Sequence, residues 1–156
     1  IIMVLGIISV PSILTMRSSY QLKAAARDIT DIFRKARAMA IKFKRPVVLE
    51  FNVDQHFYTL DSRRYPPKGT LPLYYGSGVR FGYPGRTKAV NFKNLATNSD
   101  AGERITFNSQ GMTGNVAGFI HLQNKSSGKQ GYRVGIQGIA SNIVMQSCET
   151  VDCTAN

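Results

Sequence analysis

The first 45 residues constrain the fold most, because they form one long helical pattern that is uncharged at its start. Residues 1–16, IIMVLGIISVPSILTM, carry no charge, and a helix of that length extends about 24 Å. This is slightly short of the roughly 30 Å hydrocarbon core of a bilayer, so we expect apolar residues upstream to complete a span. We interpret the segment as part of a transmembrane or filament-core helix, along which lie Ile1, Val4, Leu5, Ile8, Pro11 and Leu14.

A secretory signal peptide is the main alternative, since it also has a short apolar centre. Against it, no small-residue cleavage site precedes a mature start, and Ser18 and Ser19 run directly into the next helical pattern. Within the apolar segment, Pro11 lacks a backbone donor. We therefore expect a kink or local melting between Gly6 and Pro11.

The next segment, residues 17–45, has the clearest periodicity in the chain. Its apolar residues recur in steps of three and four: Leu22, Ala25, Ile29, Ile32, Ala36, Met39 and Phe43. Such a stripe predicts an amphipathic continuation of the same helix, with a basic outer face. Pro46 ends the pattern, because proline cannot donate to the helical ladder.

After Pro46 the apolar period becomes that of strands. Residues 46–53 and 56–60 predict a hairpin across Asp54 and Gln55. We expect further strands at 71–75, 79–83, 89–92, 104–108, 116–123, 131–137 and 142–146, joined by loops such as RRYPPKGT and NKSSGKQG. The prediction is therefore an α+β fold in which residues 46–156 form an antiparallel β-rich head.

The chain has 20 Lys and Arg residues against 9 Asp and Glu, a net charge of +11 that favours polyanions such as nucleic acid, anionic lipid or lipopolysaccharide. Its two cysteines, Cys148 and Cys153, have no nearby His to complete a zinc site. We predict a disulfide that pins the tail, adds about 2 kcal/mol and places the head outside the cytoplasm. The alternative is a pair of free thiols in a cytosolic protein.

No constellation in the sequence indicates catalysis or a bound cofactor. His56 and His121 both fall in strand-like runs, and the acids are scattered singly. The glycines of SQGMTGN lack the strand before and helix after that a nucleotide loop needs, so we interpret them as turn residues. We expect neither an enzyme nor a metal site. A soluble enzyme with an uncleaved signal is disfavoured by the unbroken join between the two helical patterns.

Three stretches resemble the GspH/FimT family of minor pilins and pseudopilins. The first is IIMVLGIISVPSIL, which is similar to the interior of a type IV pilin N-terminal helix. The second and most specific is AAARDITDIFRKARAMAIKFKRPVVLEFN, and the third comprises ITFNSQGMTGNVAGFIHLQ and GYRVGIQGIASNIVM. The resemblance implies a pilin-like fold and a structural subunit that assembles into, primes or caps a type IV pilus or a type II secretion pseudopilus. The sequence does not discriminate between these two filaments.

The resemblance also implies a location and partners. The protein would sit in the inner membrane as a single-pass protein with a periplasmic head, and later at or near the tip of a filament. Its partners would be the lipid bilayer before assembly, a prepilin peptidase, an inner-membrane assembly platform, and other pilins or pseudopilins through the N-terminal helix.

DNA capture is the alternative function. In FimT-like members, arginines in the closing strand are linked to DNA binding, but the matching positions here read Gly138, Ile139, Ala140 and Ser141. Other bases could neutralise phosphates in their place, and nearby tyrosines (Tyr65, Tyr74, Tyr75 and Tyr83) could stack on single strands. The candidate bases are Arg63, Arg64, Lys68, Arg80, Arg86, Lys88, Lys93, Lys125 and Lys129.

Overall fold

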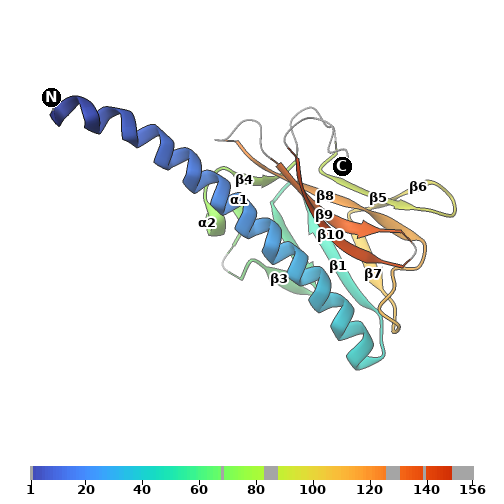
Figure 1. The fold of residues 1–156 in the computed structure, drawn as a ribbon. Coiled ribbons are helices and arrows are strands. Elements are labelled where there is room, and N and C mark those ends of the chain that lie inside the picture. Colours follow the sequence, from blue (N-terminus) through green and yellow to red (C-terminus); the bar gives the residue numbers. More distant parts are fainter. Residues whose placement is uncertain (1, 68, 83–87, 126–130, 139, 149–156) are drawn as a thin grey trace.

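A single long helix, α1, dominates the computed structural model of the protein (Figure 1). The structure describes residues 2–67, 69–82, 88–125, 131–138 and 140–148, and describes α1 side chains only from Met16 onward. Helix α1 spans Ile2–Phe43, which makes it about 63 Å long at 1.5 Å per residue. It ends where Lys44 adopts a left-handed φ of 49°, two residues before Pro46.

The helix continues through Pro11, so the local melting expected between Gly6 and Pro11 is wrong. The missing proline donor removes a single backbone hydrogen bond. The helical turns on both sides then keep the chain in register.

Two antiparallel sheets form the head. One has the strand order β3–β2–β1–β7, and the other has the order β10–β9–β8–β5–β6, with β4 also paired to β8. The strands are β1 Val47–Asn52, β2 Phe57–Leu60, β3 Arg63–Tyr65, β4 Val79–Phe81, β5 Val90–Asn94, β6 Ser99–Gly102, β7 Arg104–Phe107, β8 Val116–Asn124, β9 Gly131–Gln137 and β10 Asn142–Cys148. A short helix, α2, covers Leu71–Tyr75. The α+β prediction is confirmed.

The core lies between α1 and the two sheets, and Phe33 is at its centre. This side chain is fully buried, and its ring lies 5.8 Å from that of Phe51 and 6.5 Å from those of Phe92 and Phe107. Phe51 and Phe107 belong to the first sheet and Phe92 to the second. One helical residue therefore contacts both sheets.

The first hairpin is confirmed, because Leu49 pairs with Leu60 and Asn52 with Phe57. The strand predicted at 71–75 is wrong: this segment is helix α2. Its Pro72 occupies the first turn, where a proline's missing donor costs nothing, and the preceding Thr70 has the extended backbone of an N-cap residue.

The loop predicted for RRYPPKGT is wrong at its start, where Arg63–Tyr65 form β3. A two-residue turn connects β2 to β3, with φ of 50° at Asp61 and 69° at Ser62, the geometry of a tight hairpin. Strand β6 was not predicted either. By contrast, the glycines of SQGMTGN do lie in a turn, where the Asn108 side-chain oxygen accepts hydrogen bonds from the backbone of Gln110 and Met112.

Candidate assembly helix and basic surfaces

Helix α1 has two parts with different surroundings. Figure 1 shows its later turns lying against the sheets, while its N-terminal turns extend beyond the head. At the boundary, Met16 and Tyr20 are 60% and 67% exposed, and their spacing of four residues puts them on one face. Five of the predicted assembly residues are in the first turns of α1, whose side chains the structure does not describe: Val4, Leu5, Ile8, Pro11 and Leu14. The sixth, Ile1, is outside the described residues.

In the part of the chain that the structure describes, no helix has both the length and the apolar character that crossing a bilayer requires.

Two hydrogen bonds attach α1 to the head on the side where the helix extends beyond the sheets. The buried Asn124 side chain, at the end of β8, donates a hydrogen bond from Nδ2 to the Ser18 carbonyl at 3.0 Å. The Tyr75 hydroxyl of α2 donates to the Asp28 carboxylate. Burial and this hydrogen bond both raise the pKa of Tyr75, so the phenol remains a donor at neutral pH. The projecting turns therefore emerge from a rigidly attached base.

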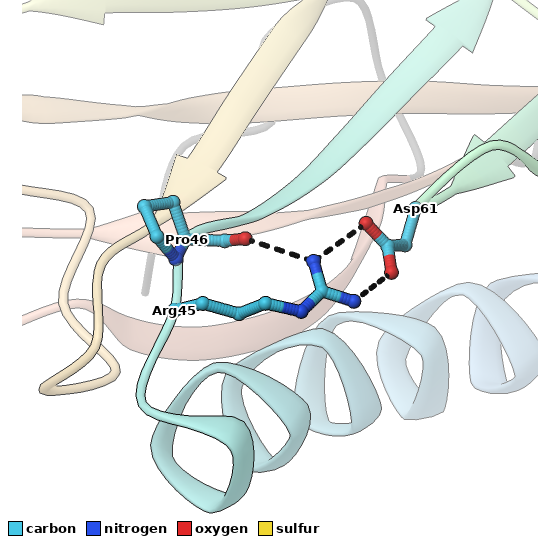
Figure 2. A network of polar contacts seen from close by, with 3 residues as sticks. All are labelled: Arg45, Pro46 and Asp61. Carbon is cyan, nitrogen blue, oxygen red and sulfur yellow. Dashed lines mark hydrogen bonds and ion pairs between the residues drawn. The ribbon is translucent and has the colours of Figure 1, made fainter.

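The other end of α1 is linked to the β2–β3 turn (Figure 2). The Arg45 guanidinium donates to both carboxylate oxygens of Asp61, with 3.1 Å between Nη1 and Oδ1, and also to the Pro46 carbonyl at 3.4 Å. The hydrogen bond from Arg45 lowers the pKa of Asp61. Because both side chains are partly exposed, the pair orients the turn more than it stabilises the fold.

The candidate DNA-binding bases fall into three separate groups among the described residues. Arg63 and Arg64 are exposed on β3, the outer strand of the first sheet. The Arg64 guanidinium lies 3.9 Å from the ring centroid of Phe57, a cation–π contact. Lys68, Arg86 and Lys129 lie outside the described residues.

The second group surrounds His56. Burial lowers the pKa of this imidazole, and the positive charges of Arg80 and Lys125 lower it further, while Asp54 opposes them. Within the described part of the chain, His56 Nδ1 and Arg80 Nε are buried without hydrogen-bond partners. Arg80 is thus partly withdrawn from solvent, whereas Lys125 is exposed.

The third group is on β5 and its approach. Lys88 forms an ion pair with Asp100, and Lys93 is exposed on β5. The hydrogen bond from Lys88 lowers the pKa of Asp100 most, and the backbone hydrogen bond from Gly102 and the positive charges of Lys88 and Lys93 lower it further. The structure therefore brings no more than two of the predicted bases together at any one place that it describes.

Residues 138–141, the positions matched above to the closing-strand arginines of FimT-like proteins, contain no base. Gly138, with a φ of 73°, accepts a hydrogen bond at its carbonyl from the Ser141 backbone. Ser141 is fully buried, and its hydroxyl accepts a hydrogen bond from the Thr113 backbone at 2.9 Å. The hydrogen bond between Thr113 and Ser141 holds the turn before β10 against the head.

The remaining predicted features are the second histidine and the two cysteines. His121 is buried on β8, where its Nδ1 lies 3.3 Å from the Ala89 carbonyl. Among the described residues, no group of three His, Cys, Asp or Glu side chains could hold a metal ion. Cys148 ends β10 and is buried, but the disulfide predicted with Cys153 involves a residue outside the described ones and stays a prediction.

Sequence reasoning missed the residues that attach α1. Ser18 and Asn124 are separated by 106 positions, and Asp28 and Tyr75 by 47, so no local pattern links them. The one local hint was a polar Asn at the end of an apolar strand.

Comparison with known proteins gives one finding about descent. A family model described as "Type II transport protein GspH" matches residues 25–139, which covers the later turns of α1 and the head as far as the β9–β10 turn. No curated protein and no solved structure matches the chain.

Proposed function

The chain belongs to the GspH family, and on this basis we propose that it is a minor pilin or pseudopilin, a structural subunit without catalytic chemistry. It assembles into, primes or caps a type II secretion pseudopilus or a type IV pilus. It begins in the inner membrane with its head in the periplasm. Its partners are other pilins or pseudopilins, the prepilin peptidase and the assembly platform.

One observation carries this proposal: α1 continues past the head as a helix whose residues 2–16 are uncharged (Figure 1). Such a helix exchanges lipid neighbours for other apolar helices at little net hydrophobic cost. The contacts of Asn124 with Ser18 and of Tyr75 with Asp28 support a further point. They hold the helix at a fixed angle to the head, as a subunit that packs by its helix requires.

The test is a charge placed in the apolar segment. Replacing Ile8 with Lys puts an ammonium in lipid or a helix bundle, at a cost of about 2.5–3.5 kcal/mol on insertion scales. We expect recovery of the chain in sheared filament fractions to fall by more than tenfold, while Ile8→Leu, the apolar control, is unchanged. Normal incorporation of Ile8→Lys, with the head still folded, would refute assembly through this helix.

DNA capture is the second candidate, favoured by the two adjacent exposed arginines on an outer strand of a chain with net charge +11. The test measures the affinity of the full chain in detergent for labelled duplex and single-stranded DNA at several salt concentrations. Replacing Arg63 and Arg64 with Gln should reduce the salt slope by about one per lost phosphate contact. Absence of binding at physiological salt would eliminate this candidate.

A further inference from the structure

Two hollows lie end to end along one side of α1, and together we call them the flank groove. Five residues of α1 at steps of three and four form one wall: Asp28, Ile32, Lys35, Met39 and Lys42. Helix α2 and the β2–β3 hairpin form the other wall. The hollows have volumes of about 250 Å³ and 410 Å³ and share Lys35 and Tyr65 in their linings.

The two ends of the groove have opposite charge. The smaller hollow, next to α2, contains the carboxylates of Asp28 and Asp31 among four tyrosines, with Lys35 at its border to the larger hollow. Asp31 forms an exposed ion pair with Arg34, and Asp28 accepts the Tyr75 hydrogen bond. The larger hollow, at the end of α1, contains four bases, Lys35, Lys42, Arg45 and Arg63, and one acid, Asp61. Asp61 already pairs with Arg45. Among the described residues, no carboxylate lies within ion-pair distance of the other three bases.

The floor between the two ends is apolar. Ile32, Tyr58 and Leu60 line it and are buried, and Met39 is partly buried. In the middle, Lys35 Nζ donates to the Tyr65 hydroxyl at 3.4 Å and lies 5.6 Å from the ring centroid. This long, exposed contact connects the α1 wall to β3 at the junction of the two hollows, and it is weak enough to be displaced.

The dimensions fit an extended peptide. From Asp28 to Lys42 the helix rises about 21 Å, at 1.5 Å per residue. An extended chain covers this distance in about six residues, at 3.3 Å per residue. Charge decides what kind of chain fits, because a polyanion or an anionic lipid surface would be repelled at the Asp28 end.

We propose that the flank groove binds an extended segment of a neighbouring filament subunit, with Lys or Arg at one end, Asp or Glu at the other and apolar residues between. The basic end enters the tyrosine-lined hollow, where Tyr74 and Tyr75 offer ring faces beside Asp28. The acidic end meets Lys42 and Arg63. This inference rests on the proposed function for the source of the segment, but the binding itself does not require a filament.

The binding test uses the full, isotope-labelled chain in zwitterionic detergent micelles and follows its NMR signals during titration. The probes are a blocked hexapeptide with arginine first, glutamate last and alternating valine and serine between, and two relatives with glutamate or arginine at both ends. We expect the mixed peptide to bind most tightly and to shift signals of Lys35 and Tyr65.

Three variants locate the site, and Asp28 is left intact because it accepts the Tyr75 hydrogen bond that attaches α1 to the head. Asp31→Asn and Lys42→Gln should each weaken the mixed peptide about two- to five-fold, the range for an exposed ion pair. Lys23→Gln, which removes the same charge from another side of α1, should leave it unchanged. If the all-glutamate peptide, duplex DNA or anionic vesicles bind this groove more tightly, or if Lys23→Gln weakens binding as much as Lys42→Gln, the proposal is overturned.

A second readout separates this proposal from the proposed function. In filament-producing cells, we expect the Asp31→Asn/Lys42→Gln double variant, which keeps the Tyr75–Asp28 attachment, to enter filaments less than the wild type does. If the double variant enters normally, the filament is not the source of the segment. If the wild type itself never enters filaments, the proposed function fails, whatever the peptide result.

Discussion

Replacing Phe33 with Ala should produce the largest single loss of stability that the structure predicts. The side chain is fully buried and its ring contacts Phe51, Phe92 and Phe107, so it connects α1 to both sheets. Burial of a Phe side chain accounts for about 1.5–3 kcal/mol. Adding the cavity and the lost ring contacts gives an expected cost of about 3–5 kcal/mol.

The assay is thermal unfolding of the full chain, followed by near-ultraviolet circular dichroism of its tyrosines and phenylalanines. The head and the later turns of α1, roughly 130 residues together, have an unfolding entropy of about 0.27 kcal/mol/K, so a loss of about 4 kcal/mol lowers Tm by about 15 °C. Phe33→Leu should lose about half as much.

The control is Phe43→Ala, the same chemical change at a residue that is 52% exposed at the end of α1. It should cost less than about 1 kcal/mol, because little apolar surface returns to water. If Phe33→Ala costs under about 1.5 kcal/mol, or no more than Phe43→Ala, Phe33 does not hold α1 and the two sheets together.

Three further predictions follow from single sites. Gly118→Ala should destabilise the head by about 2–4 kcal/mol in denaturant unfolding, because at its φ of +142° an added Cβ would lie 1.8 Å from a β5 carbonyl oxygen. The control is Gly114→Ala, where an added Cβ meets open space, and it should cost far less. Equal costs for the two variants would disprove the clash. Burial and nearby bases lower the pKa of His56, so the unfolded chain binds more protons than the folded chain. Stability should therefore fall as the pH drops below about 7, through the unfolded pKa near 6.5, and level off below the folded pKa. His56→Gln should remove this pH dependence, and its persistence would show that another group is responsible. If Cys148 and Cys153 are bonded, intact mass should rise by about two hydrogens on reduction, whereas two alkylatable thiols before reduction would contradict the bond.

Local patterns were sufficient for the helix and most strands. The stripe from Leu22 to Phe43 alone predicted the later part of α1, because side chains three and four positions apart must share a face. Alternation also predicted β1 and β2, since Val47, Leu49 and Phe51 all point into the core.

The errors lie where short-range signals compete. Leu71–Tyr75 is a short apolar run that suits a strand or a helix, and only its Pro72 favours the helix. The β2–β3 turn uses Asp61 and Ser62 where a glycine would have given a clear signal. Both segments bond to other parts of the chain: the Leu71 N–H donates to the His56 carbonyl, and β3 pairs with β2.

The sequence by itself determined that a long helix with an uncharged start is followed by a β-rich head, because periodicity and charge are properties of neighbouring residues. Only the tertiary structure decided that β7 pairs with β1, that Asn124 contacts Ser18, and that acids and bases line opposite ends of one groove. These arrangements join positions up to 106 residues apart. The free energy of packing selects them only when the whole chain is folded.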